Sequence, residues 1–483
     1  MDGGRPDATG FARESNRPPL PHPRPAEFYH SPPPVHYQQP YPPYPPPVPP
    51  KRVNVLRVAL LVALAVLLLA PAGAIAFEAT RQDRTATLAG QGLGTAGDRP
   101  VGESNGGGAK GGSGETKGAP PTTVDGKVRR ALSDQGAALV GGDQAAFLAP
   151  VDQTATKLRD DLARRFGSLR QLQVKVWEPT VVDKVKVVGD GTATAKVYVR
   201  YCFVVETCDP MNFQTATRWN VSGKTVTLLE FGVSDDLGPR PWEASELRTA
   251  VGQRVVLSTT PKYASRLPSM LASAEKAAAL TDRYAKWGPP PSRYTVYLAG
   301  PDEWSSWYGI KQENWVAGFA LPLTPNATEI VLNAARVDAK ETLDVLRHEF
   351  THVVTLAGVD RAYDKTWWLV EGLAEYVRVK GEGKPFSQMS DVRAYVRSGH
   401  WKNEIAMDDP PEGASTSDVS GRYGIAYLSV QRLADRFGEE KMLDFFDLTT
   451  RQGMSLTDAA PKALGMSWDD VANDCVRNVK ART

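Results

Sequence analysis

The chain has 483 residues, too many for one ordinary hydrophobic core, so two or more domains are expected. Its 57 lysines and arginines balance 55 aspartates and glutamates, for a formal net charge of +2. This balance, and the absence of lysine tracts interleaved with aromatic residues, argue against nucleic acid as a partner.

The first 52 residues form a tail that is rich in proline and tyrosine. Of the 38 prolines in the chain, 17 fall within the first 50 residues. Proline fixes φ and removes a hydrogen-bond donor, so residues 1–52 are expected to stay disordered and to sample polyproline II conformations. The tail is a candidate ligand for a cytoplasmic partner with an aromatic groove, and a tail without any partner is the alternative.

An uncharged apolar run over residues 58–77 follows the tail. Its 20 residues would span about 30 Å as a helix, the thickness of the hydrocarbon core of a bilayer. We therefore predict a single transmembrane helix over residues 53–77. Lys51, Arg52 and Arg57 lie on the N-terminal side of the apolar run 58–77, which predicts a cytoplasmic tail and extracytoplasmic domains at the cell membrane. A cleaved signal peptide is the alternative, although the preceding tail is far longer than a usual n-region.

A glycine-rich stretch over residues 78–123 is typical of a flexible linker. A first folded domain is then expected over residues 124–240. Two helical patterns, over residues 124–140 and 153–169, precede several segments of β-type alternation. Helices followed by an antiparallel run indicate an α+β domain. This order resembles the nuclear-transport-factor-like cone fold, which implies a ligand-binding mouth, and a spacer or partner-docking module is the alternative.

Three cysteines occur in the chain, and two of them lie close together. Cys202 and Cys208 are six residues apart, across a predicted strand end and turn. A local disulfide between them is plausible in an extracytoplasmic domain, and two unpaired thiols are the alternative. Zinc binding by these cysteines is not expected, because no second pair completes a set of four ligands.

A second domain is expected over residues 250–483. Its first half predicts a long helix over residues 262–286 and short strands at residues 293–299, 315–320 and 328–334. From residue 338 onward the pattern is almost entirely helical. Strands before helices again indicate an α+β fold, so we expect a membrane-anchored ectodomain of two domains.

The segment LRHEFTHVVT, residues 346–355, contains two of the six histidines of the chain. Positions i and i+4 share one face of a helix, so His348 and His352 can each present a nitrogen to one point about 2.0–2.1 Å away, which suits zinc. Glu349 lies beside that face and can reach a water on the metal without ligating it, as a general base would. A histidine pair on a surface helix that binds no metal is the alternative.

Glu371 is the candidate third ligand, because a catalytic zinc takes three protein ligands and keeps one open position. The 18 residues between His352 and Glu371 are enough for one helix to end, a loop to turn and a second helix to run back. A solvated glutamate is the alternative, but the apolar neighbours Trp368 and Leu369 make an unpaired carboxylate expensive. Glu375 shares the helical face of Glu371 and can accept the outer N–H of a ligating histidine.

The motifs HEFTH and WLVEGLAEY, at this HExxH-x18-E spacing, resemble the gluzincin zinc metallopeptidases of the thermolysin-like MA clan, and among them the compact peptidase MA-like domains. The likeness covers about residues 250–450. It implies a mostly helical metallopeptidase domain in which His348, His352 and Glu371 hold Zn²⁺ and Glu349 is the general base.

The same resemblance implies an edge strand above the cleft, to which an extended peptide could add by β-pairing. Residues 328–335 are the candidate for this strand. It also implies an oxyanion donor from a later helix, for which Tyr423 is preferred over Tyr427 and His400. Both tyrosines share a helical face and could instead be core residues.

These features predict a zinc-dependent peptidase that is anchored in the membrane and hydrolyses peptides or proteins outside the cytoplasm. No GAMEN-like stretch for gripping a free amino terminus is found, which favours an endopeptidase. The alternative from another class is a non-catalytic binding or sensory protein with a peptidase-like domain. A structural zinc protein is disfavoured, because structural sites usually carry four protein ligands.

Overall fold

The computed structural model of the chain describes residues 122–483, apart from residues 190, 311–315, 360–365, 384 and 412. The predicted tail (1–52), the predicted transmembrane helix (53–77) and nearly all of the predicted linker (78–123) lie outside the described residues. Within the described part of the chain, no helix combines the length and the apolar character needed to cross a bilayer.

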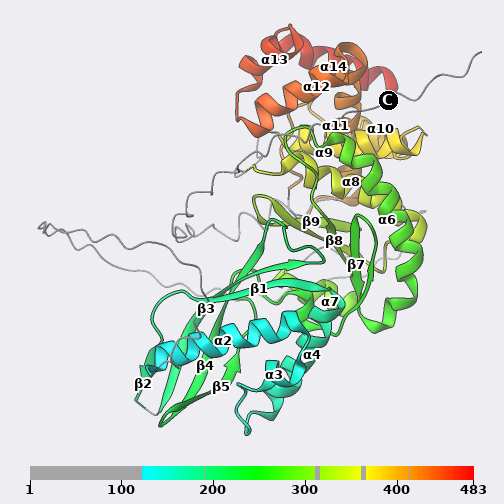
Figure 1. Cartoon of the computed structure of the whole chain (residues 1–483). Coiled ribbons are helices and arrows are strands. Elements are labelled where there is room, and N and C mark those ends of the chain that lie inside the picture. Colours follow the sequence, from blue (N-terminus) through cyan, green and yellow to red (C-terminus); the bar gives the residue numbers. More distant parts are fainter. Residues whose placement is uncertain (1–121, 190, 311–315, 360–365, 384, 412) are drawn as a thin grey trace, which may run out of the picture. The chain divides into compact units, whose positions relative to one another are not determined.

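The first part of the described chain consists of helices followed by an antiparallel sheet, as Figure 1 shows. The helices are α2 (Val124–Gly141), α3 (Gln144–Leu148) and α4 (Thr156–Gln171). The strands are β1 (Val174–Val181), β2 (Lys186–Val188), β3 (Thr192–Phe203), β4 (Met211–Ser222) and β5 (Thr225–Phe231). They pair in the order β1-β3-β4-β5, with β2 added to β3, and every pairing is antiparallel. The predicted α+β order is confirmed, while the likeness to the cone fold stays a prediction.

A disulfide joins Cys202, near the end of β3, to Cys208, with the two Cα atoms 6.1 Å apart. It closes the loop between β3 and β4. The third cysteine, Cys475, is buried and free.

The second part begins with a mixed five-stranded sheet of order β6-β7-β8-β10-β9. Its strands are β6 (Arg248–Val251), β7 (Val255–Thr259), β8 (Tyr294–Ala299), β9 (Gly318–Thr324) and β10 (Ala327–Asn333). The three central strands are parallel, and β6 and β9 pair antiparallel at the two edges. The strands β6 and β7 were not predicted, because each is too short to show a clear period.

The structure corrects the predicted edge strand. Residues 328–335 fall largely in β10, which lies between β8 and β9 and is therefore an interior strand. The edge strand is β9. Pro322 explains why β9 lies at the edge. Proline has no N–H to donate to a strand on the other side of β9, so it is tolerated at the edge of a sheet and not in its interior.

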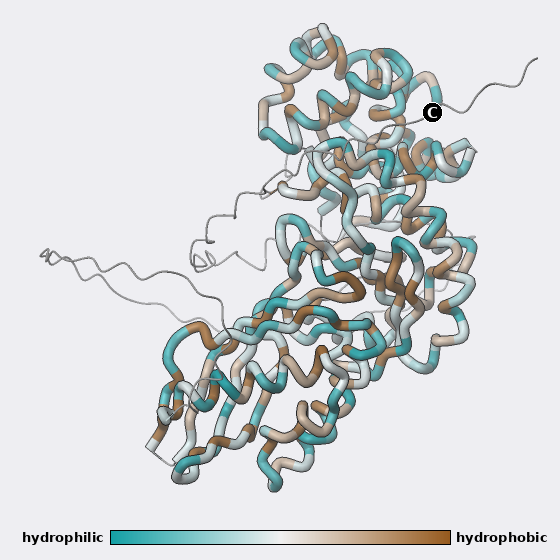
Figure 2. Tube along the Cα trace, in the orientation of Figure 1, coloured by the Kyte–Doolittle hydropathy of each residue, from teal (hydrophilic) through white to brown (hydrophobic). Residues whose placement is uncertain are grey.

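Both faces of this second sheet are buried. Along β8, Val296 and Leu298 belong to the core shared with the helical part, whereas Tyr297 and Ala299 belong to the core shared with the first sheet. Figure 2 shows that apolar residues are concentrated in these strands. Burial on both faces explains why successive residues of its parallel strands are buried, instead of every second one. The first part thus completes the packing of the sheet that borders the helices.

The rest of the second part is helical, as predicted. The segment predicted as one helix over residues 262–286 contains α6 (Leu267–Thr281), with short 3-10 turns on either side. The further helices are α5 (Pro241–Ala244), α7 (Pro301–Ser306), α8 (Ala339–Leu356), α9 (Trp367–Glu382), α10 (Met389–Arg397), α11 (Thr416–Phe437), α12 (Glu439–Phe446), α13 (Leu456–Leu464) and α14 (Trp468–Arg482). Of these, α8, α9 and α11 provide the candidate site.

Candidate metal centre

Helix α8 presents the two histidines. It begins with a capping box, in which the Asp338 side chain accepts the N–H of Glu341 and the Glu341 side chain accepts the N–H of Asp338. It ends just before Gly358, whose φ of +76° turns the chain away. The helix is unbroken between these signals, so His348 and His352 lie on one face.

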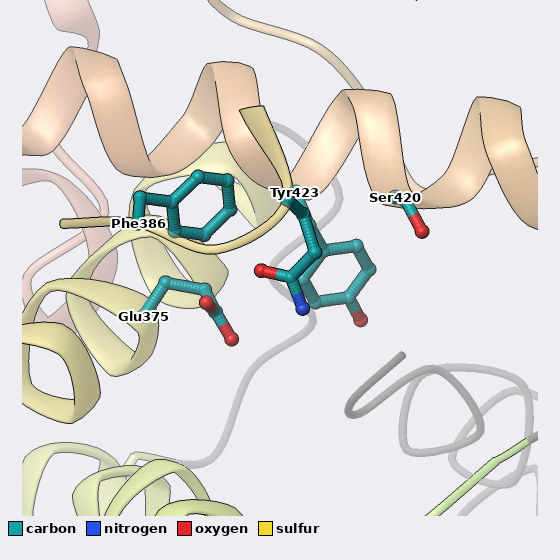
Figure 3. Close-up of a pocket in the computed structure, with 5 residues that line it drawn as sticks. Glu375, Phe386, Ser420 and Tyr423 are labelled. Atoms are coloured by element: carbon teal, nitrogen blue, oxygen red, sulfur yellow. The ribbon is translucent and has the colours of Figure 1, made fainter. Parts of the chain in front are cut away.

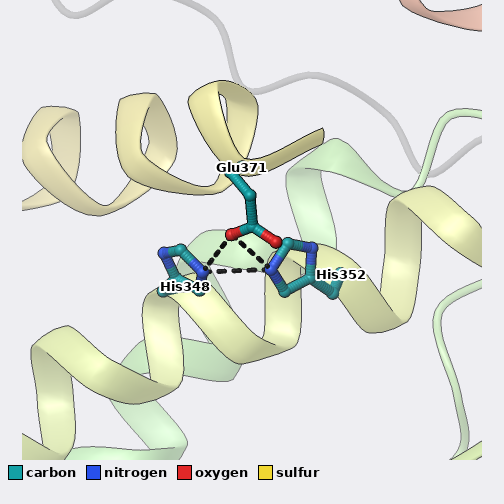
Figure 4. A group of neighbouring side chains, drawn as sticks. All are labelled: His348, His352 and Glu371. Atoms are coloured by element: carbon teal, nitrogen blue, oxygen red, sulfur yellow. Dashed lines mark hydrogen bonds and ion pairs between the residues drawn. The ribbon is translucent and has the colours of Figure 1, made fainter. Parts of the chain in front are cut away.

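Three side chains converge on one point, as Figure 4 shows. The Nε2 atoms of His348 and His352 are 3.0 Å apart. The Oε2 atom of Glu371 lies 3.1 Å from Nε2 of His348 and 3.4 Å from Nε2 of His352. All three residues are buried, and His352 and Glu371 keep 8% and 7% of their surface exposed. Among the described residues, this is the group that could hold a metal ion.

A close approach between α9 and α11 places Glu371 in this position. A Cβ on the neighbouring Gly372 would lie 2.5 Å from the carbonyl oxygen of Ala426 on α11, so only glycine permits the two helices to come so near. The contact sets Glu371 over the histidines of α8 and brings α11 to the same site.

The donor set and its spacing fit zinc. Two imidazole nitrogens and one carboxylate oxygen are ligands of a catalytic zinc, and bonds of about 2.0–2.1 Å in a tetrahedron place ligand atoms about 3.4 Å apart. The observed separations of 3.0–3.4 Å match this spacing. A tetrahedral ion held by these three atoms would have a fourth position for water or substrate, as a catalytic site requires.

The electrostatics of these side chains also favour a cation at this point. Burial disfavours charge on His348, but its hydrogen bonds with Glu371 and Glu375 outweigh burial and raise its pKa to about 10. Burial also acts to raise the pKa of Glu371, but the charge of His352 and the hydrogen bond with His348 hold that pKa at about 2. Both shifts show that the carboxylates stabilise positive charge between these side chains.

Glu375 lies behind His348, where the sequence analysis expected it. Its Oε1 atom is 2.9 Å from Nδ1 of His348. If Nδ1 carries the proton, Nε2 is left free to face the cluster, which is the tautomer that a metal ligand needs.

Glu349 lies beside the cluster with an unpaired carboxylate. The residue is fully buried, and neither carboxylate oxygen has a hydrogen-bond partner among the described residues. Burial raises its pKa to about 7, against the opposing charges of His348 and His352. The backbone N–H of Ala320 on β9 is close enough to lower that pKa, although it forms no hydrogen bond of normal geometry. A buried carboxylate without a partner costs free energy, and a catalytic role is one reason for a protein to keep such a group.

The structure separates the three oxyanion candidates. Tyr423 is 4% exposed, its hydroxyl has no partner among the described residues, and its ring centroid is 6.3 Å from that of His348. Burial and, next, the charge of Glu371 raise its pKa well above the usual value. Tyr427 instead stacks on Phe386, with ring centroids 4.6 Å apart. His400 is largely exposed and pairs with Asp418, so it lies outside the cluster. Of these three candidates, Tyr423 is the one that borders the cluster.

Two features of the site were missed by sequence reasoning. One is Arg378, which pairs with Glu375 through its Nη2 and Oε2 atoms at 2.6 Å. Its spacing of three residues from Glu375 on a helix could have indicated the pair. The other is a small pocket beside Glu375, shown in Figure 3 and lined by Glu375, Phe386, Gln388, Ser420 and Tyr423.

Residues 318–404 match the model of a family described as BSP, a peptidase of plants and bacteria. The matched segment starts at β9 and contains His348, Glu349, His352 and Glu371. It ends before α11 and Tyr423. No curated protein matches the chain. The His-His-Glu metal site thus lies in a segment that matches a peptidase family.

The chain is also similar to solved structures. One is the crystal structure of an M1 zinc metallopeptidase variant from Deinococcus radiodurans, at 15% identity and a TM-score of 0.28, over 61% of this chain and 62% of that chain. Another is a two-domain M1 zinc metallopeptidase variant bound to L-arginine, at 16% identity and a TM-score of 0.29, over 54% of this chain and 58% of that chain. The chain spans about three fifths of the length of both proteins.

Proposed function

We propose that the protein is a zinc-dependent peptidase that is anchored in the cell membrane and hydrolyses peptide bonds of a peptide or protein outside the cytoplasm. The observation that carries this proposal is the convergence of His348, His352 and Glu371 on one point beside the unpaired, buried carboxylate of Glu349. This combination has the parts of a hydrolytic metal site: three ligands, an open position and a base.

The residues of the chain divide the chemistry between them. When bound to the three ligands, zinc supplies a Lewis acid that acidifies water and polarises the carbonyl of the peptide bond. Glu349 removes a proton from the attacking water as the new C–O bond forms. The same carboxyl group then gives this proton to the amide nitrogen, and the C–N bond breaks to release the amine. Burial of Glu349 keeps bulk water away from this proton transfer.

The edge strand β9 is suited to hold an extended substrate. The N–H of Asn333 donates to the carbonyl oxygen of Ala317 at 2.8 Å. Because β9 and β10 are antiparallel, the backbone groups of every second residue of β9, counted from Ala317, point toward β10. The backbone groups of Gly318 and Ala320 therefore face away from β10. A peptide paired with this edge would pass beside Glu349, next to which Ala320 lies. An internal stretch of chain can bind in this way, which supports an endopeptidase.

Tyr423 is the proposed donor to the oxyanion that develops on the attacked carbonyl. Tyr423→Phe is expected to lower kcat by about 10²-fold, with KM and zinc content little changed, because the lost hydrogen bond forms mainly in the transition state. Steady-state kinetics on a cleaved peptide measure this. Tyr427→Phe is the matched control, one helical turn away on α11, and is expected to keep near-normal kcat. Equal losses in both variants would refute the assignment.

The membrane anchor over residues 53–77 and the extracytoplasmic location are part of the proposal. The Cys202–Cys208 disulfide supports them, because such bonds persist in oxidising compartments. Protease added to intact cells should digest the folded domains and leave the tail, the candidate site for a cytoplasmic partner, protected. Protection of the folded domains would contradict this orientation.

The whole proposal is tested by metal analysis and cleavage assays on the purified full-length chain. We expect about one zinc per chain and hydrolysis in a broad peptide library that stops with a chelator and returns with added zinc. Zinc binding without cleavage of any peptide would instead favour the alternative, a non-catalytic binding or sensory protein. Absence of zinc binding would refute the metal centre.

A further inference from the structure

Glu375 is shared between two partners, one on each carboxylate oxygen. Its Oε1 atom lies 2.9 Å from Nδ1 of His348 on α8. Its Oε2 atom accepts hydrogen bonds from Nη2 of Arg378 at 2.6 Å and from Nε of Arg378 at 3.0 Å. His348 is therefore connected to Arg378 through a single carboxylate.

Arg378 is itself held from several sides. Its side chain is 1% exposed, and burying an unpaired guanidinium to this extent would cost much free energy. The Nη1 atom pairs with Glu382, one helical turn further along α9. The Nη2 atom also reaches Oε1 of Gln388 at 3.3 Å, and the Phe386 ring lies 5.8 Å from Cζ. The planar fork of the guanidinium thus has one orientation, and it presents two parallel N–H groups to Glu375.

A small pocket borders the Glu375 side chain. Glu375 lines the pocket together with residues of α11 and of the segment before α10, among them Tyr423 and Gln388 (Figure 3). On this side the Glu375 carboxylate is not fully enclosed by packed side chains, so its hydrogen bonds with Arg378 hold it toward His348. In another orientation of this carboxylate, Nδ1 of His348 would lose its acceptor, and the ring would keep only its contacts on the Nε2 side, with His352 and Glu371.

We propose that Arg378 is a positioning residue of the metal centre, which acts through Glu375 to keep the His348 ring in the orientation that binds zinc. The inference rests on the proposed metal centre. The new element is the role of Arg378, a residue that contacts neither the metal position nor a substrate. Outer hydrogen-bond partners of metal ligands typically contribute about 10–100-fold in metal affinity.

Zinc affinity, measured by competition with a chromophoric chelator on the purified full-length chain, tests the proposal. Arg378→Met keeps an unbranched, flexible side chain but removes every side-chain N–H group, and it is expected to weaken zinc binding about 10–100-fold. Arg378→Lys keeps the charge but cannot donate two parallel N–H groups, so we expect a smaller loss of at least about threefold. Arg432→Met is the matched control, because it breaks the Arg432–Asp474 pair between α11 and α14, away from the cluster. Its zinc affinity should equal that of the wild type.

A double variant tests whether Arg378 acts through Glu375. In a Glu375→Gln background, Arg378→Met should cause little further loss of zinc affinity, because the contact it stabilises has already been altered. Additive losses would overturn the proposal. So would a variant with a lowered melting temperature but unchanged zinc affinity, which is the result expected from a purely structural ion pair.

The outcomes separate this inference from the proposed function. If the wild type binds zinc and Arg378→Met binds it equally well, the inference fails and the peptidase proposal stands. If the wild type binds no zinc, both fail. If Arg378→Met does not fold, as judged by circular dichroism, the Arg378→Lys variant decides: an unchanged affinity overturns the inference, and a loss of threefold or more supports it.

Discussion

Glu349→Gln is expected to remove most of the peptide hydrolysis while zinc stays bound. Glutamine has the shape of glutamate, so the fully buried site should keep its packing. The amide cannot take a proton from the attacking water, and general acid–base catalysis typically contributes about 10²–10⁴-fold to the rate. We therefore expect kcat to fall by about this factor, with KM little changed. Steady-state kinetics and zinc analysis of the same sample measure both quantities.

The matched control for this variant is Glu341→Gln, the same chemical change on the same helix. Glu341 accepts the N–H of Asp338 in the capping box, and a glutamine oxygen can do the same. Its activity should stay near that of the wild type. Retention of full activity in Glu349→Gln would show that another group serves as the base. Loss of zinc from that variant would show instead that Glu349 belongs to the ligand set.

Glu371→Gln is expected to release zinc and with it the activity. Glu371 supplies the negative charge of the ligand set, with Oε2 3.1 Å and 3.4 Å from the two imidazole nitrogens. Zinc-binding free energies of about 10–16 kcal/mol over four ligands correspond to about 3 kcal/mol for each ligand, so the affinity should fall by about 10²-fold or more. Chelator competition measures the affinity. Excess zinc should restore part of the activity.

Glu440→Gln is the control for Glu371→Gln, because Glu440 is an exposed glutamate in the first turn of α12. It should bind zinc as tightly as the wild type. If Glu371→Gln also bound zinc with unchanged affinity, the third ligand would have to be another group, and the site would differ from the one described.

The pairing of the two histidines at the candidate metal centre was predictable, because it depends only on the local geometry of a helix. Positions i and i+4 of any helix share a face, so His348 and His352 lie together once α8 forms. The capping box at Asp338 and the glycine at 358 mark both ends of that helix in the sequence itself. Glu371 required a further inference, namely that the second helix returns over the first. Gly372 is what makes that return close enough, and its role is invisible without α11.

The edge strand shows where sequence reasoning failed. β10 is buried along nearly its whole length, as an interior strand is, yet residues 328–335 were assigned to the edge. Pro322 in β9 is the signal that would have corrected this, since proline is confined to edges and bulges of sheets. Strand order arises from contacts between distant segments, so periodicity within one strand does not report it.

Taken alone, the sequence determined that His348 and His352 share one face of a helix with Glu349 beside it, because helix periodicity places residues close in the chain on a common face. That these side chains hold zinc and that Glu349 acts as base stay predictions. The folded chain decided which strand borders the site, which tyrosine faces it, and that Arg378 connects to His348 through Glu375. These depend on which helices and strands lie side by side, and packing between residues far apart in the chain selects those neighbours.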